Sequence, residues 1–354
     1  MSTQGNRKII CEAAHADSIW CKQLLSGLIK EFKKRRWNYE EIQDVKEIGY
    51  GEQLYVIGVG NQWMKNVVGH CNGLDCVPVI LSNQAVRNVS GKYHCVCADI
   101  FGVMEKLSES CQEAGRERVA LYGISNASVS DEEQMKEFSE LIQDASDIYR
   151  NHGNLETCFR KFLPYADRYD VVVCVNGYAA VSLVKKLEAA NKELLEKLVI
   201  ISCEEIMLSA RYSKWISRID LKLESFGNTA IAVMEMAAGR CDIASVSVAI
   251  EGDVCEIPAK MQEEDAWLED YDESLLFADP EVVCMARIEQ LLQESDETDN
   301  RIIEMLLANA KYNEIAESCF MTEGNVKYRV KKYMSICKVK TKRELLDLLQ
   351  EYLP

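Results

Sequence analysis

The sequence predicts an α/β protein of two lobes, followed by a small all-α domain. From Lys8 to about Ile257, short apolar runs alternate with longer amphipathic stretches, which is typical of strands and crossover helices in parallel sheets. After Asn300, four short helical patterns occupy about fifty residues. The chain of 354 residues is longer than one hydrophobic core usually supports, so several domains are expected.

Eight short segments are predicted strands. Each is mostly aliphatic or β-branched, and Gly, Asn, Asp or Ser bounds it. The segments are KIICEAA, QLYVIGVG, VPVILSN, YHCVCAD, RVALYGIS, DVVVCVN, KLVIISC and SVSVAIEG. Helical periodicity lies between them, at 21–34, 102–114, 131–148, 178–190 and 226–238. Eight strands with crossover helices exceed one open doubly wound sheet, which favours two parallel sheets with flanking helices.

Composition favours a reducing compartment. No apolar run approaches the ~18 residues of a membrane span, and the N-terminus lacks the apolar core of a signal peptide. The 15 cysteines are an odd number, and they lack the paired spacing of zinc sites. We therefore expect a cytoplasmic protein with no membrane association, metal or cofactor, in which most cysteines are small core residues.

The net charge of −16 is unevenly distributed along the chain. Residues 261–299 hold fourteen acids and one base, whereas residues 300–354 hold ten bases and seven acids. These shifts divide the chain into domains at 1–258 and 299–354, joined by an acidic linker at 259–298.

A helix near 280–294 is predicted inside the linker. Asp279 is a capping residue, Pro280 suits the first helical position, and Glu281 suits the positive helix end. The apolar positions form one stripe: Val282, Met285, Ala286, Ile288 and Leu292. This helix either packs on a neighbouring domain or pairs with a second copy of itself.

The third helix of the C-terminal domain, at 323–336, has one apolar and one basic face. Its predicted buried stripe is Val326, Val330, Met334 and Cys337, which leaves Lys327, Tyr328, Lys331, Lys332 and Ser335 on the opposite face. Lysines supply affinity for phosphates, and a long exposed helix fits the major groove. The alternative is a solvated lysine face on an ordinary helical bundle.

The last fifty residues closely resemble the LuxR-type helix-turn-helix of bacterial transcription regulators. The matching features are N-E-I-A on the scaffold helix, T-E-G-x-V-K opening the recognition helix, and K-V-x-x-K-R-E-L before the fourth helix. The resemblance implies binding to double-stranded DNA. It places Lys327, Tyr328 and Lys331 at the DNA interface, and we expect Asn325, Arg329 and Lys332 of the same helix to contribute to binding as well. Tyr328 replaces a smaller residue common in that family, so no base preference is carried over.

The order of elements from Lys8 to Ile257 resembles the periplasmic-binding-protein-like effector domain of the LacI/GalR family. The segments that carry the likeness are RERVALYGIS, DVVVCVNGYAAVSLVKKLEAANKE, LVIISCEEI and LKLESFGNTAIAVMEMAAG. The resemblance implies a two-lobed fold that binds a small effector at the carboxyl ends of its strands. The implied effector residues are Asp17, Ser18, Trp20, Asn61, Ser82, Asp99, Asn126, Gln134, Asn176 and Glu204. Trp63 and Asn83 lie in the same loops, but a core aromatic and a loop cap are the favoured interpretations there.

Three positions depart from the sugar-binding members of that family. Gln134 stands in place of an Arg, Gly177 in place of an Asp, and Glu204 in place of an Asp. The effector is therefore not assumed to be a simple sugar and could be another polar metabolite. The order of domains also differs, because that family carries its DNA-binding domain at the N-terminus.

Together these features predict a ligand-responsive transcription regulator that acts as a homodimer. One alternative is a ligand-binding module whose C-terminal bundle docks a protein. Another is an α/β enzyme, but the sequence shows no nucleophile, metal cluster or phosphate loop to support one, and Gly58-Val59-Gly60 lacks the third glycine of a dinucleotide motif. We therefore expect that the protein is not an enzyme.

Overall fold

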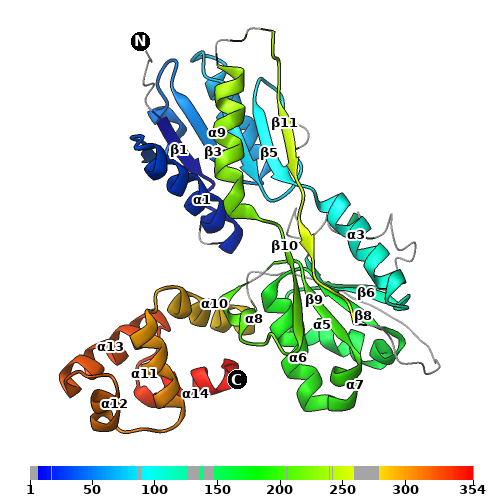
Figure 1. Ribbon diagram of the computed structural model, residues 1–354, viewed down its shortest axis with the longest axis vertical. Coiled ribbons are helices and arrows are strands. Elements are labelled where there is room, and N and C mark those ends of the chain that lie inside the picture. Colours follow the sequence, from blue (N-terminus) through cyan, green and yellow to red (C-terminus); the bar gives the residue numbers. More distant parts are fainter. Residues whose placement is uncertain are drawn as a thin grey trace. The chain divides into compact units, whose positions relative to one another are not determined.

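The computed structural model describes residues 7–16, 18–86, 89–125, 135–136, 138, 147–204, 206–238, 240, 242–258 and 279–353. It divides into two compact units (Figure 1). The first unit comprises Met1–Ala114, Ser128–Ala145 and Ile219–Ile257, and the second comprises Gly115–Ala127, Ser146–Arg218 and Pro258–Pro354. The structure contains two six-stranded sheets with flanking helices, and the C-terminal helices belong to the second unit, so the predicted fold class is confirmed.

The sheet of the first unit has the order β11-β5-β4-β3-β1-β2, and all its strands are parallel. Its strands are β1 (Arg7–Cys11), β2 (Glu40–Ile42), β3 (Gln53–Ile57), β4 (Val79–Ser82), β5 (His94–Ala98) and β11 (Ser247–Ile250). Five of the six are predicted from the sequence. β2 is not, because Glu-Glu-Ile is short and polar, as suits a strand at the sheet edge.

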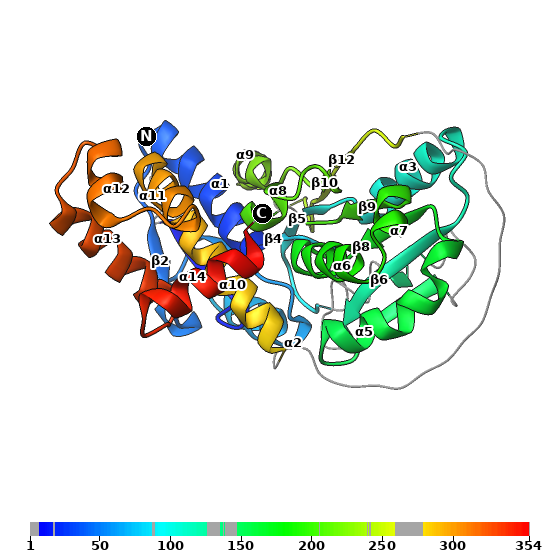
Figure 2. The same ribbon diagram turned by 90° about the horizontal axis from the view of Figure 1, so that it is seen from below.

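Helices cover both faces of this sheet. α1 (Ile19–Arg35) and α9 (Phe226–Ala237) lie side by side on one face (Figures 1 and 2), where their apolar side chains meet Tyr55 and Ile57. α2 (Asn61–Cys71) packs on the other face against Leu54 and Val56. Alternate residues of β3 thus face opposite helix layers, as the pleat requires. α3 (Ile100–Glu113) follows β5.

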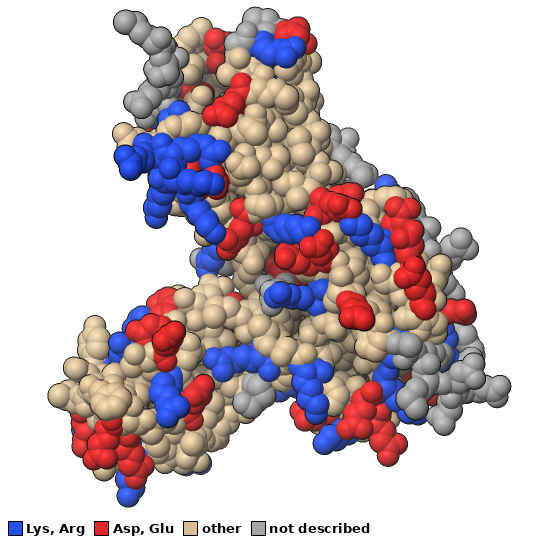
Figure 3. All heavy atoms as spheres, viewed as in Figure 1, with Lys and Arg blue, Asp and Glu red and all other residues tan. Residues whose placement is uncertain are grey.

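Two glycines allow α1 and α9 to approach closely. A Cβ on Gly27 would lie 2.2 Å from the carbonyl oxygen of Glu224, in the turn before α9, and one on Gly227 would lie 2.5 Å from the backbone of Gly27. Only glycine fits at this crossing. α1 ends in Lys33, Lys34 and Arg35, and Figure 3 shows basic side chains gathered at that end, where they complement the helix dipole.

The second sheet, whose strands β6–β9 lie in the second unit, has the order β12-β10-β9-β8-β6-β7 and is parallel except for the β10–β12 pair. Its strands are β6 (Val119–Ser125), β7 (Ile148–Asn151), β8 (Val171–Cys174), β9 (Val199–Ser202), β10 (Ile216–Asp220) and β12 (Asp253–Val254). β7, β10 and β12 are not predicted. The helix predicted at 131–148 lies mostly outside the described residues, and its last residue is wrong, since Ile148 begins β7.

The helices of this unit begin at the carboxyl ends of its strands. They are α5 (Leu155–Phe162) after β7, α6 (Gly177–Ala190) and α7 (Lys192–Lys197) after β8, and α8 (Met207–Ala210) after β9. Gly123 forms a bulge in β6 with φ of 89°. A Cβ there would lie 2.7 Å from that of Ala179, so the glycine lets α6 pack directly on the strand.

Five helices complete the chain: α10 (Pro280–Gln293), α11 (Glu297–Leu307), α12 (Tyr312–Ser318), α13 (Glu323–Ile336) and α14 (Lys342–Tyr352). Asp279 caps α10, as its sequence predicts. The buried side of α10 includes Met285, Ile288, Leu291 and Leu292, and Leu291 takes the place predicted for Ala286, which is exposed. Because α10 packs against α8, α13 and α14 of the same chain, the structure favours the packed linker over a dimerising helix.

Most cysteines in the described part of the chain are core residues, as expected: ten of the fourteen described thiols are buried. Within the described part of the chain, no helix is long and apolar enough to span a membrane.

Candidate functional site

The carboxyl edge of the first sheet holds several predicted effector residues, and two of them are helix caps. Ser18 Oγ accepts a hydrogen bond from the N–H of Cys21 at 3.4 Å and donates one to the carbonyl oxygen of His15 at 2.7 Å. Asp99 caps α3 by accepting from the N–H of Gly102 at 3.1 Å. Their positions at strand ends are therefore built by local capping.

The loop after β4 carries buried polar atoms. Ser82 is fully buried, and its Oγ accepts from the N–H of Gln84 at 3.4 Å. The side-chain oxygens of Asn83 and Gln84 are buried and accept no hydrogen bond from any described residue. Buried amide oxygens normally have partners, so this loop is a good candidate for contact with a polar ligand. The sequence analysis favoured a loop cap for Asn83 and did not identify Gln84.

The predicted effector residue Trp20 packs in the core of the first unit. Trp20 is only 8% exposed and packs among α1 and β-strand side chains, with its ring centroid 5.7 Å from that of His15. Trp63 packs on the opposite helix layer, which agrees with the core interpretation of that residue. Asn61 is the first residue of α2 and is half-buried.

Glu12, a residue that the sequence analysis missed, organises this edge. Its carboxylate accepts hydrogen bonds from the N–H groups of Val59 at 3.0 Å and Gly60 at 2.9 Å. A Cβ on Gly60 would lie 2.1 Å from Glu12 Oε1, and one on Gly58 would lie 2.9 Å from Oε2. The two glycines of Gly58-Val59-Gly60 therefore make room for a carboxylate of the same chain. An acid at the end of β1 together with this glycine pair is the signal that could have identified it.

The carboxyl edge of the second sheet holds Asn176 and Glu204. Asn176 caps α6 by accepting from the N–H of Ala179 at 3.0 Å. Glu204 lies in the turn between β9 and α8, where its carbonyl oxygen accepts from Ser202 Oγ at 2.6 Å. Burial raises the pKa of the nearby Tyr178 phenol, and the carboxylates of Glu289 and Glu204 raise it further. The predicted residues Asp17, Asn126 and Gln134 lie outside the described residues.

Two helices joined by a short turn, α12 and α13, follow α11. α12 packs against α13, and Thr322 caps α13 by accepting a hydrogen bond from the N–H of Asn325. Val326, Val330, Tyr333 and Cys337 are buried on α13. The prediction of Met334 in this stripe is wrong, because Tyr333 is the fully buried residue and Met334 is half-buried. Tyr333 turns inward because its hydroxyl donates to Asp299 of α11, and burial raises its pKa.

The outer face of α13 is exposed at five of the six predicted DNA-binding residues: Asn325, Lys327, Tyr328, Lys331 and Lys332. Lys327 pairs with Glu323 at 3.1 Å, and Lys332 with Glu294 at 3.7 Å. Arg329 differs, because it is half-buried and pairs with Asp296 at 3.0 Å and Asp299 at 2.5 Å. The two carboxylates raise the pKa of the Arg329 guanidinium above its ordinary value, and the ion pairs connect α13 to α11.

No model of a known protein family and no curated protein matches the sequence. Solved structures do match. The transcriptional regulator CelR, in complex with cellobiose, aligns with a TM-score of 0.57 and 12% identity over 72% of this chain and 83% of that one. A LacI family transcription regulator from Clostridium acetobutylicum aligns at 0.57 and 14% over 71% and 98%. The LacI family regulator CCPA from Weissella paramesenteroides, with bound sucrose, aligns at 0.55 and 10% over 72% and 98%.

At these identities the similarity is one of fold. The two parallel sheets and their flanking helices are those of the periplasmic-binding-protein-like fold, the fold of LacI/GalR effector domains, over about 72% of the chain. The matched structures described above and a glucose-galactose binding protein from Geobacillus stearothermophilus are regulators and binding proteins rather than enzymes.

Proposed function

We propose that this protein is a ligand-responsive transcription regulator that binds double-stranded DNA through α13. The observation that carries the proposal is the exposed face of α13, where Lys327, Tyr328 and Lys331 stand in a helix-turn-helix arrangement. The LuxR-type residue pattern of the same segment supports it. Lysines at this face would contact phosphates, and the side chains near the start of α13 would reach base edges. Arg329 is not included, because its guanidinium is held by Asp296 and Asp299.

The proposed effector is a small polar molecule, a sugar or a metabolite of similar polarity. Two of the structures with this fold contain cellobiose and sucrose. In this chain, the buried oxygens of Asn83 and Gln84 would accept hydrogen bonds from hydroxyl groups. The other proposed contacts in the described residues are Ser18, Asn61, Ser82, Asp99, Asn176 and Glu204.

We further propose that the regulator acts in the cytoplasm as a homodimer without catalytic activity. One short recognition helix makes few base contacts, so two copies would be needed for a specific site. Because α10 is buried within the chain, the dimer would form through another surface.

DNA binding is tested by a double variant, Lys327→Ala with Lys331→Ala, in the full chain. Binding to a short duplex of mixed sequence should weaken, and the slope of log K against log salt should fall by about one unit for each lost phosphate contact. The matched control is Lys65→Ala with Lys92→Ala, which removes the same charge from exposed positions of the first unit. Equal binding by both double variants would contradict the proposal.

One observation favours the protein-docking alternative. Phe320 is 97% exposed and Tyr328 is 73% exposed, and exposed aromatic side chains are common at protein interfaces. This alternative predicts no retardation of DNA by the unmodified protein even at low salt.

A further inference from the structure

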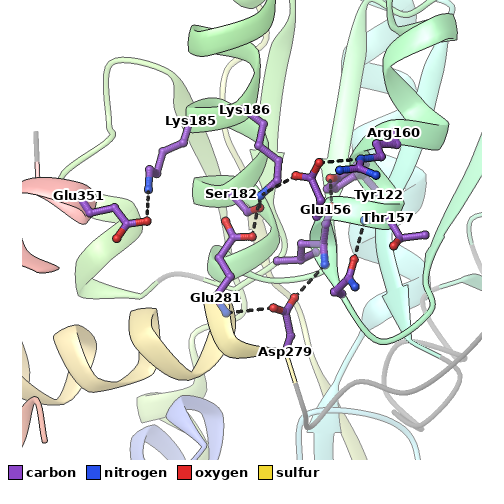
Figure 4. A network of polar contacts seen from close by, with 12 residues as sticks. Tyr122, Glu156, Thr157, Arg160, Ser182, Lys185, Lys186, Asp279, Glu281 and Glu351 are labelled. Atoms are coloured by element: carbon purple, nitrogen blue, oxygen red, sulfur yellow. Dashed lines mark hydrogen bonds and ion pairs between the residues drawn. The ribbon is translucent and has the colours of Figure 1, made fainter.

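Carboxylates of α10 and of its capping residue connect this helix to other helices of the second unit (Figure 4). Asp279 accepts a hydrogen bond from the N–H of Leu155 at 2.8 Å, and Glu281 pairs with Lys186 at 2.6 Å. Farther along the helix, Glu289 accepts from the N–H groups of Met207 at 3.0 Å and Leu208 at 2.8 Å. Glu289 is only 2% exposed. Hydrogen bonds to a buried carboxylate are strong, so Glu289 is a principal contact of α10.

The N–H groups that Glu289 binds lie beside predicted effector residues. α8 is the next helix after β9, whose carboxyl end lies at the sheet edge where α/β sheets place ligands. Glu204 lies in the same β9–α8 turn, three residues before Met207. Tyr178 follows Asn176 by two residues, and its phenol is close enough to both Glu204 and Glu289 for each carboxylate to oppose its ionisation. The N–H groups that Glu289 binds and the predicted effector residue Glu204 therefore lie close together in the chain.

The other side of α10 packs against the proposed DNA-binding helices. It contacts α13 and α14, and Glu294, just beyond its end, pairs with Lys332 of α13. A second set of contacts involves α14: the hydroxyl of Tyr212 donates to the carbonyl oxygen of Tyr352 at 3.0 Å, and Lys185 Nζ lies 3.7 Å from the Tyr352 ring centroid. α10 therefore packs against α8 on one side and against α13 and α14 on the other.

We infer that Glu289 couples the effector edge to the DNA-binding helices. Its carboxylate binds the start of α8, which follows Glu204 in the chain, and Glu289 itself belongs to α10, which packs against α13. The inference rests on the proposed function and adds its route of regulation. Effector binding at Glu204 and docking of α10 are then linked equilibria, and each changes the other by the same factor.

Hydrogen–deuterium exchange of the full chain tests the docking role without DNA or effector. In Glu289→Ala, the amides of Met207 and Leu208 should exchange about tenfold faster or more, as should those of α10 and α14. Glu289→Gln keeps the side-chain size and one acceptor, so it should give a smaller increase and serves if the alanine variant does not fold. The control Glu304→Gln removes the same charge from an exposed position of α11 and should change nothing. Faster exchange confined to Met207 and Leu208 would overturn the inference, since Glu289 would then only cap α8.

The coupling itself is tested from the effector side. Glu204→Gln should alter exchange in α10 and α14 by about fivefold or more, although neither helix contains the changed residue. An effect limited to the β9–α8 turn would overturn the inference. Failure of the proposed function is a separate result, because it would appear as no binding of a mixed-sequence duplex by the unmodified protein at low salt.

Discussion

At the scale of single residues, the backbone of Phe320 is strained in the turn between α12 and α13. Its φ is 52°, in the left-handed region, and its side chain is 97% exposed, so burial offsets little of the backbone cost. Phe320→Gly should stabilise the C-terminal helices by about 0.5–1 kcal/mol, the left-handed cost less the extra entropy that glycine loses. Slower exchange of the Val326 and Val330 amides would measure it.

The neighbouring residue provides the control for this prediction. Cys319 has φ of −98°, which carries no left-handed strain, so Cys319→Gly relieves nothing and should destabilise the same helices through the extra backbone entropy that glycine loses. If both glycine variants shifted exchange in the same direction, strain at Phe320 would not be the cause.

The role of a residue was predicted well where its neighbours in the sequence determine it, and poorly where a partner far away in the chain does. The cap at Asp279 follows from local sequence, and it is observed. The burial of Tyr333 depends on Asp299, 34 positions earlier, and the capture of Arg329 depends on Asp296 and Asp299. A helical period cannot reveal such partners, because it describes only the helix itself.

At the scale of elements, His94 makes the attachment of β11 depend on pH. Its Nδ1 accepts a hydrogen bond from the N–H of Val246 at 3.0 Å, directly before β11. Burial lowers the pKa of His94 below its ordinary value of 6.5, so the folded protein binds this proton less readily than the unfolded chain. The stability from His94 is complete above pH 6.5 and is lost as the pH falls from there through the folded pKa.

Exchange of the β11 amides at two pH values checks this prediction. After correction for intrinsic rates, Ser247–Ile250 should be less protected at about pH 5.5 than at about pH 7.5. His94→Asn keeps an acceptor that does not titrate, so its protection should be the same at both. A pH effect that persisted in this variant would exclude His94 as its source.

Substitution by alanine should have opposite effects at two helical glycines, one at the crossing of α1 and α9 and the other on α2. Gly27→Ala should destabilise the first unit by about 1–3 kcal/mol, because its Cβ would lie 2.2 Å from the Glu224 carbonyl oxygen. Gly69→Ala on α2 should stabilise it by about 0.5–1 kcal/mol, because no atom lies within 4 Å of that Cβ. Thermal unfolding of the two variants measures the sign. A stable Gly27→Ala protein would show that the crossing is loosely packed.

The elements found from sequence are those with their own apolar pattern. All eight predicted strands are present, because fully buried parallel strands are continuous aliphatic runs. β2, β10 and β12 were missed because they are short or contain charged residues, and their pairing depends on neighbours far away in the chain. The same limit applies to α10, whose apolar stripe was visible but whose partners, α8 and α13, were not.

At the scale of the whole molecule, the C-terminal helices are part of a larger compact unit. α10–α14 belong to the same unit as strands β6–β9 of the second sheet. This predicts that the C-terminal helices and the second sheet are stabilised together, whereas the first sheet is independent of them.

A core variant of α10 tests this division. Ile288 is fully buried, so Ile288→Ala should cost about 2–5 kcal/mol. Because α10 packs against α8, α13 and α14, exchange should accelerate in all three helices, while β1, β3 and β4 of the first sheet keep their protection. Val283→Ala on the same helix is the control, since Val283 is 38% exposed and its loss should cost little. Acceleration in α13 and α14 alone would mean that the C-terminal helices are a stability unit of their own, and that α10 docks on the second sheet too weakly to share its cooperativity.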